Sequence, residues 1–299
     1  MGSHIPLAGL INIETTLRVE RFPVEYAPAR YPFFGVGSSV SGVGYNVAKA
    51  LTTLGHPVTF LALIGRDAAG ELVRGALAQA GIDGAHVRAD LDATPQSVIL
   101  YDSEGKRSIF VDLKDIQERA YPAEPAASAL TGAGLAVLCN VNFTRPMLAQ
   151  ARALGVPVAT DVHAIGDLDD AYNRDYMAAA SVLFQSHENL PCSPGAWIER
   201  LWAHYRTPLA VVGMGADGAL LGVLESRQIA HVPAVTTRPV VNTIGAGDAL
   251  FSAFIHGVVR GSDPLTALRK AVVFASYKIG VAGAADGFLD APALDRLCG

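Results

Sequence analysis

Residues 240–257 read VVNTIGAGDALFSAFIHG, and this stretch carries the clearest signal of both fold and chemistry in the chain. Extended residues pass through a Gly-Ala-Gly turn into an apolar run that predicts a helix. Glycines at 245 and 247 allow a sharp turn and leave backbone N–H groups uncovered. A helix that starts at such a turn offers unpaired N–H groups and a positive dipole end. We therefore expect an anion such as a phosphoryl group to bind here.

Asp248 follows this turn directly. A carboxylate in the first helical turn can accept a proton from an attacking hydroxyl while the neighbouring N–H groups face a phosphate. The alternative is that Asp248 only caps the helix and the glycines only turn the chain. Spacing alone leaves both interpretations open.

Two further glycine clusters mark boundaries between elements. Residues 41–46 read SGVGYN and open a predicted helix, where Asn46 would either cap the helix or bond a sugar hydroxyl. Residues 213–218 read GMGADG and match the G-x-G-x-x-G pattern of dinucleotide-binding folds. That fingerprint needs a helix next, whereas residues 219–224 read as a strand. A glycine turn beside a nucleotide is therefore favoured over a dehydrogenase loop.

Outward from these clusters, strand-like and helix-like runs alternate along most of the chain. Such alternation implies an α/β fold with a mostly parallel central sheet and helices on both faces. Residues 13–41 and 86–115 lack it, and we expect them to form a small β-sheet lid. Within the second range, residues 102–107 form a polar connection typical of a β-hairpin. One domain over residues 5–299 is the simplest account.

The bulk composition excludes several classes of protein. The 299 residues are 51% hydrophobic and 17% charged, which suits a folded domain with a sizeable core. A net charge of −5 gives no electrostatic footprint for nucleic acid or an anionic membrane. No apolar run approaches the ~18 residues of a membrane span. P-loop, protein-kinase and G-x-S-x-G hydrolase motifs are absent. Residues 1–4 read MGSH, which is typical of an expression-tag remnant.

The three cysteines are widely spaced and show no metal-binding pattern; they are Cys139, Cys192 and Cys298. Free thiols are typical of a reducing compartment, so a cytoplasmic protein is expected.

Taken together and in this order, the three clusters resemble the ribokinase-like (PfkB) carbohydrate kinase family over nearly the whole chain. Residues 41–67 resemble its N-terminal signature, and residues 242–248 resemble its C-terminal signature, D-T-x-G-A-G-D. The resemblance implies a three-layer α/β sandwich with a β-sheet lid. It also implies transfer of the γ-phosphoryl group of MgATP to a hydroxyl of a sugar or nucleoside, and it favours the catalytic interpretation of Asp248.

Carried over residue by residue, the resemblance implies three groups of site residues and one metal ligand. Asp248 would be the general base, and Gly245, Ala246 and Gly247 would form the anion hole. The residues expected to bind substrate are Glu14, Gly42, Gly44, Asn46 and Asn142. Those expected to contact ATP are Gly215, Gly218, Thr243 and Gly283. The magnesium ligand would be Glu188.

The sequence also departs from the family pattern. Asn242 stands where the family usually has Asp near a monovalent-cation site, so activation by K⁺ is left open. Residues 186–189 read SHEN where N-x-x-E is usual, which places Glu188 next to the expected acidic position. Asn142 stands where ribokinase itself has Glu. These differences argue against ribokinase itself.

The substrate is expected to be an unphosphorylated sugar or sugar-like compound. Glu14, Asn46 and Asn142 suit neutral hydroxyls, whereas a phosphorylated sugar would need additional Arg or Lys side chains. One alternative is a nucleoside kinase, in which aromatic side chains would stack on the base; the candidates are Tyr31, Phe33, Phe34 and Tyr45. Another is a binding or regulatory protein without turnover. Exposed sheet edges invite pairing, so a homodimer through the lid is a further expectation.

Overall fold

The computed structural model describes residues 4–104 and 106–299. Three residues of the suspected tag and Gly105 of the predicted hairpin connection lie outside this part. The described chain forms a nine-stranded sheet in the order β13-β12-β11-β10-β9-β8-β1-β4-β5. Its strands are β1 (Ile5–Ala8), β4 (Val58–Gly65), β5 (Val87–Leu91), β8 (Ala136–Leu138), β9 (Val158–Asp161), β10 (Ala180–Ser186), β11 (Leu209–Gly213), β12 (Ala219–Val223) and β13 (Gln228–Val232). Only the β11–β12 and β12–β13 pairs of this sheet are antiparallel, so the prediction of a mostly parallel sheet is confirmed.

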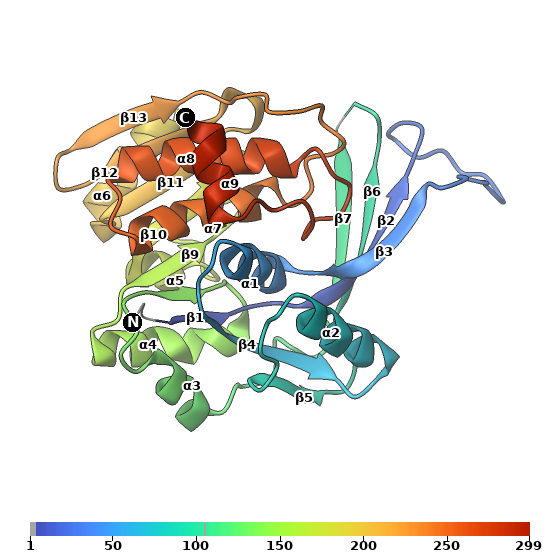
Figure 1. The fold of residues 1–299 in the computed structure, drawn as a ribbon, viewed down its shortest axis with the longest axis horizontal. Helices are drawn as coiled ribbons and strands as arrows, with labels where there is room; N and C mark the ends of the chain where they lie inside the picture. Colours follow the sequence, from blue (N-terminus) through green and yellow to red (C-terminus); the bar gives the residue numbers. More distant parts are fainter. Residues whose placement is uncertain (1–3, 105) are drawn as a thin grey trace.

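Helices cover both faces of the large sheet (Figure 1). One layer contains α1 (Val43–Thr53), α2 (Ala68–Gln79), α7 (Ala246–Val259), α8 (Pro264–Lys278) and α9 (Ala291–Cys298). The other contains α3 (Ala123–Leu130), α4 (Arg145–Leu154), α5 (Arg174–Ala179) and α6 (Pro194–Tyr205). Strand β4 shows why both layers form, because Phe60 and Ile64 pack toward the first layer while Leu61 and Leu63 pack toward the second. The predicted three-layer sandwich is confirmed.

A separate four-stranded sheet stands beside the large one, with strand order β3-β2-β6-β7 (Figure 1). Its strands are β2 (Asn12–Arg18), β3 (Val36–Ser41), β6 (Gln96–Tyr101) and β7 (Arg107–Asp112). The β6–β7 pair is antiparallel, so the predicted hairpin is confirmed.

The range predicted for the second part of this smaller sheet, 86–115, begins too early. Strand β5 lies inside that range but pairs with β4 at the edge of the large sheet. Val87 and Leu91 at its ends pack into opposite core layers, and the pairing register shifts between Leu63 and Gly65 of β4. An irregular strand of this kind lacks the alternation of apolar and polar residues that would indicate which sheet it joins.

Candidate active site

Two helices begin with a glycine, and they are neighbours in the first layer. Gly42 precedes α1 with φ 100°, and Gly245 precedes α7 with φ 75°; neither helix start has a side-chain cap. Side chains accept first-turn N–H groups at the starts of α2, α6, α8 and α9, whereas α3, α4 and α5 also lack such a cap but do not begin after a glycine. A Cβ added to Gly245 would lie 2.5 Å from the carbonyl oxygen of Ala284, so this position has room only for glycine. The start of α7 is therefore kept open to a ligand anion.

A hydrogen bond joins the beginnings of these two helices. The Nδ2 atom of Asn46 in α1 donates to Oδ2 of Asp248 in α7 at 2.7 Å, across 202 residues of sequence. The hydroxyl oxygen of Ser41 lies 3.1 Å from Oε2 of Glu14 and 3.3 Å from Oδ1 of Asn46, so its one hydrogen can be donated to either acceptor. The structure thus brings Glu14, Asn46 and Asp248 together, as the sequence predicts, and adds Ser41 as the link between them.

Burial sets the electrostatics of this chain of polar groups. Desolvation raises the pKa of Asp248, an effect that the Asn46 hydrogen bond opposes and the charge of Asp161 reinforces. Desolvation also raises the pKa of Glu14, against the lowering effect of the Ser41 hydrogen bond. A carboxyl group with a raised pKa is a stronger base once ionised, which suits Asp248 to accept a proton.

Lys278 is a charged residue of the site that sequence reasoning missed. It is the last residue of α8, is fully buried, and donates through Nζ to the carbonyl oxygen of Ile244. Burial lowers its pKa to about 8, while the charges of Asp248 and Glu14 act to raise it. The available signal was a single lysine in the otherwise uncharged run FASYKIG at residues 274–280.

The N–H groups left open at the glycine turn differ from those of the predicted anion hole. The N–H of Ala246 donates to the carbonyl of Thr243 at 3.2 Å, so it is already paired. Gly247 and Asp248 are the second and third residues of α7, whose N–H groups have no carbonyl partner within the helix. A Cβ placed on Gly247 would meet nothing within 4 Å, which shows that this face of the turn is open.

Two of the residues predicted to contact ATP, Thr243 and Gly283, lie in or next to the turn. Thr243 is part of the turn, and its carbonyl and hydroxyl oxygens accept hydrogen bonds from Nη1 of Arg107 at 3.4 and 3.3 Å. Gly283 lies in the loop after α8, next to Ala284, whose carbonyl approaches Gly245. Arg107 was predicted only as part of the hairpin, and its reach across to the turn could not be read from the sequence.

The other two, Gly215 and Gly218, lie in the connection from β11 to β12. A strand follows them, so the expectation that this cluster is not a dinucleotide loop is confirmed. Gly218 has φ 93°, and a Cβ there would lie 2.1 Å from the carbonyl oxygen of Val232, which explains the glycine.

Two residues predicted to bind substrate have other tasks in this structure. The side chain of Asn142 donates to the carbonyl of Gln117 at 2.9 Å and accepts from Arg145 at 3.3 Å. Gly44 is buried where a Cβ would lie 2.7 Å from the Cα of Gly9, so it permits close packing of α1 on β1. Neither residue is joined to the Glu14–Asp248 chain of hydrogen bonds.

The aromatic side chains considered for nucleobase stacking also lie apart from that chain. Tyr45 is buried in the core, where burial raises the pKa of its hydroxyl to about 12. Tyr31, Phe33 and Phe34 are exposed in the loop between β2 and β3.

Glu188 is an exposed residue just beyond the end of β10. No group of three His, Cys, Asp or Glu side chains suited to a metal ion occurs in the described part of the chain. Three residues earlier, Gln185 is buried, and neither atom of its amide group has a hydrogen-bond partner among the described residues.

The smaller sheet makes an apolar contact with the glycine turn. Ile99 of β6 is 2% exposed and forms a cluster with Ile244 and Ala284, against which Tyr101 packs. Together with Arg107, this cluster attaches the smaller sheet to the segment that carries the open N–H groups.

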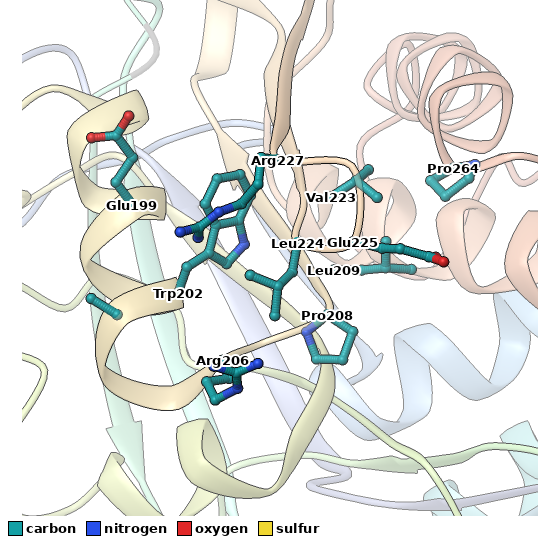
Figure 2. Close-up of a pocket in the computed structure, with 11 residues that line it drawn as sticks. Glu199, Trp202, Arg206, Pro208, Leu209, Val223, Leu224, Glu225, Arg227 and Pro264 are labelled. Carbon is teal, nitrogen blue, oxygen red and sulfur yellow. The ribbon is translucent and has the colours of Figure 1, made fainter.

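A surface hollow of about 1200 Å³ lies at the other end of the sheet. Leu209, which begins β11, lines it, whereas the glycine cluster follows the end of that strand. Figure 2 shows Arg227 reaching across the indole of Trp202 in this hollow, with its guanidinium carbon 5.5 Å from the ring centroid. The hollow is therefore separate from the Asp248 site.

Comparisons with known proteins identify relatives that match this chain over most of its length. Acarbose 7(IV)-phosphotransferase from Actinoplanes sp. is 28% identical over 302 residues, covering 99% of each chain. 1-Phosphofructokinase from Haloferax volcanii is 29% identical over 82% of this chain and 81% of the relative. The solved structure of the microbiome-derived acarbose kinase Mak1 is 25% identical, with a TM-score of 0.87, covering 100% of this chain and 99% of that one.

None of the helices in the described part of the chain is long and apolar enough to cross a bilayer.

Residues 3–291 match the family model for the pfkB family carbohydrate kinases. Because this match covers nearly the whole sequence, the chain belongs to the pfkB family of carbohydrate kinases.

Proposed function

We propose that this kinase transfers the γ-phosphoryl group of ATP to a hydroxyl of an unphosphorylated sugar or sugar-like substrate, with Asp248 as general base. The observation that carries the proposal is the hydrogen bond between Asn46 and Asp248. This hydrogen bond joins the polar cluster suited to a sugar to the open helix start suited to a phosphoryl group. The sugar hydroxyl and the phosphoryl group that it receives would therefore meet at the carboxylate of Asp248.

The reaction follows from this placement. The substrate hydroxyl oxygen attacks the γ-phosphorus, and the bond between that phosphorus and the bridging oxygen of ADP breaks. The hydroxyl proton passes to Oδ1 of Asp248, since Oδ2 is held by Asn46. The N–H groups of Gly247 and Asp248 receive the charge that develops on the phosphoryl oxygens.

ATP would lie along the ends of β10 and β11, against the residues assigned to it: Gly215, Gly218, Thr243 and Gly283. Magnesium in kinases is usually held by one or two carboxylates together with phosphate oxygens and water, rather than by a cage of protein ligands. Glu188, a single exposed carboxylate just past the end of β10, suits that mode, and the unpartnered amide of Gln185 adds a polar group nearby. When bound, the ion neutralises charge on the phosphates.

An unphosphorylated substrate is favoured because the side chains that form the hydrogen-bonded chain with Asp248 are a carboxylate, an amide and a hydroxyl, and the nearby ammonium of Lys278 is fully buried. Two of the three arginines that follow Glu14 are engaged elsewhere, since Arg21 pairs with Glu25 at 2.7 Å and Arg30 donates to the backbone of Glu25, while Arg18 is exposed at the end of β2. The names of two relatives specify acarbose, so acarbose and related pseudo-oligosaccharides are the first substrates to test.

The test is ADP release with MgATP and a panel of acceptors. The panel contains acarbose, ribose, fructose, a nucleoside and a phosphorylated sugar. We expect turnover with at least one neutral sugar or sugar-like compound and less with the phosphorylated sugar. Preference for the nucleoside would identify a nucleoside kinase instead. Tight binding of one compound without ADP release from any would indicate a binding protein and contradict the proposal.

A further inference from the structure

The buried ammonium group of Lys278 neither gives nor takes a proton in the reaction described above. Lys278 is 0% exposed, and it donates to the carbonyl oxygen of Ile244, the residue immediately before Gly245. An unpaired ammonium in an apolar interior is strongly unfavourable, so a buried lysine needs compensating partners. This one sits directly behind the turn that presents the open N–H groups.

Three features of the surroundings compensate for the burial. The carboxylates of Asp248, Glu14 and Asp286 all act to keep Lys278 protonated. Lys278 also ends α8, where the negative end of the helix dipole favours a cation. The carbonyl oxygen of Ile244 accepts a hydrogen bond directly from the ammonium. A positive charge is therefore held at a fixed place beneath the turn.

Asn242 completes the inner side of the same turn. Its Oδ1 accepts the N–H of Ile244 at 3.0 Å, and its Nδ2 donates to the carbonyl of Ala282 at 2.8 Å. Only an amide can do both, because a carboxylate has no N–H to offer Ala282. The backbone N–H groups of Val241 and Asn242 also donate to the carbonyl of Ile279, at 2.9 and 3.3 Å. The loop after α8 is thus tied to the turn by donors that belong to the chain itself.

This arrangement does not fit a monovalent cation at Asn242. Such an ion is held by carbonyl and carboxylate oxygens. Here the carbonyls of Ile244 and Ala282 face an ammonium and an amide N–H, both of which would repel the ion. The cation-binding role that the family resemblance left open is therefore already filled by side chains.

We propose that Lys278 is a positioning residue that supplies the phosphoryl-binding turn with the positive charge a bound K⁺ would otherwise provide, so that this kinase needs no monovalent cation. The inference rests on the proposed function. By holding the carbonyl of Ile244 inward, Lys278 fixes the peptide groups that follow, and the N–H groups of Gly247 and Asp248 face the phosphate. Its charge also favours the ionised form of Asp248.

The first test uses the unaltered protein. Phosphorylation rates are measured in K⁺, Na⁺ and tetramethylammonium chloride at equal ionic strength. We expect rates that agree within about twofold, because the charge is already built in. A rate in K⁺ at least about tenfold above that in tetramethylammonium would overturn the proposal. The melting temperature in the same three salts gives a readout that is independent of turnover, and stabilisation specific to K⁺ would count equally against it.

The second test removes the charge. Lys278→Met keeps a long, flexible side chain without the ammonium. We expect kcat to fall at least about tenfold while KM for the sugar changes little, since the residue orders the phosphoryl-binding turn and touches no substrate. Lys270→Met is the matched control, because Lys270 lies on the same helix but pairs with Asp295 at the surface. Full kcat in Lys278→Met, or an equal loss in Lys270→Met, would contradict the positioning role.

The rate and melting-temperature measurements also distinguish a failure of this inference from a failure of the proposed function. If no acceptor is phosphorylated in any salt, the proposed function fails. The melting temperatures then still decide whether the folded protein responds to K⁺. Equal values in all three salts would support the built-in charge, and a rise specific to K⁺ would reject it.

Discussion

At the scale of single residues, Asp248 combines two properties that a general base needs. Burial raises its pKa, which strengthens the carboxylate as a base, and Asn46 fixes the orientation of one of its oxygens. Neither property would be required of a residue that only caps a helix. The catalytic interpretation therefore makes predictions that differ from those of a cap.

Replacing Asp248 by Asn retains the shape and removes the base. We expect kcat to fall at least ~100-fold, the lower range for a general base, with ATP binding unchanged. Stability should change little, because an amide can still accept a hydrogen bond from Asn46 through its oxygen. The measurements are steady-state kinetics and titration of a fluorescent ATP analogue. Turnover close to that of the unaltered protein would refute the mechanism.

The pH dependence of the rate tests the Asn46 contact. Asp248 must be ionised to accept a proton, so the rate should fall on the acid side, at a pH above the ordinary range for Asp. The Asn46 hydrogen bond lowers the pKa of Asp248, so Asn46→Ala should raise that pKa further. We therefore expect the acid limb of the kcat profile to move to higher pH in this variant. An acid limb that stays in place would show that the contact does not tune the base.

At the scale of elements, the site depends on segments that meet only in three dimensions. The glycine turn and Asp248 were predictable because all their signals lie within a few residues of one another. Lys278 and Arg107 were not, because each comes from a different element and reaches the turn only after folding. The contact of Asn142 with Gln117, 25 residues away, was unpredictable for the same reason, and its role in substrate binding stays a prediction.

Short helices are the elements that a sequence pattern indicates least clearly. Helices α3 and α9 have only eight residues each, and α9 buries a single residue, Leu294. Such short segments carry too few buried positions to show a helical period. The longer helix α7 was predicted because its apolar run extends over several turns.

The contact between the smaller sheet and the glycine turn can be weakened at Ile99. Ile99→Ala should leave a cavity against Ile244 and Ala284, which would cost about 2–3 kcal/mol of stability and loosen the sheet. A loosened lid admits water, so ATP hydrolysis should rise relative to sugar phosphorylation. The measurements are chemical denaturation and the ratio of ADP formed to sugar phosphate formed.

Ile109→Ala is the control for this change. Ile109 lies directly opposite Ile99 on β7 but is 50% exposed, so it should lose little stability and leave the ratio unchanged. If Ile99→Ala also left the ratio unchanged, the smaller sheet would not act as a lid over the reaction.

At the scale of the whole molecule, the chain joins distant segments at both ends of the first helical layer. Near the active site, Asn46 of α1 bonds Asp248 of α7. At the far ends of the same two helices, Nε2 of His56 and Nδ1 of His256 lie 2.8 Å apart, and the two rings meet edge to face. One ring must donate and the other accept, so the contact requires the accepting ring to be neutral and is lost when both rings are protonated.

This histidine pair predicts how stability depends on pH. Burial lowers the pKa of His256 to about 4 and also lowers that of His56, and nearby Arg260 adds to both shifts. In the unfolded chain both rings titrate near pH 6.5. Between about pH 6.5 and pH 4, the unfolded state therefore binds more protons than the folded state, and stability falls as the pH falls. The pair should contribute a loss on the order of 2 kcal/mol, after allowance for its partial exposure.

Comparison with a variant that cannot titrate isolates this contribution. Urea denaturation across that pH window should show a steeper decline for the unaltered protein than for His56→Asn/His256→Asn. The double variant should start less stable at pH 7, because it lacks the ring contact, and then converge on the unaltered protein as the pH approaches 4. Asp295 and Lys270 also act on His256, so their charges remain in both proteins and cancel in the comparison. Parallel declines in the two proteins would assign the acid sensitivity to other groups, chiefly carboxylates such as Asp67 whose pKa is lowered by hydrogen bonds in the folded state.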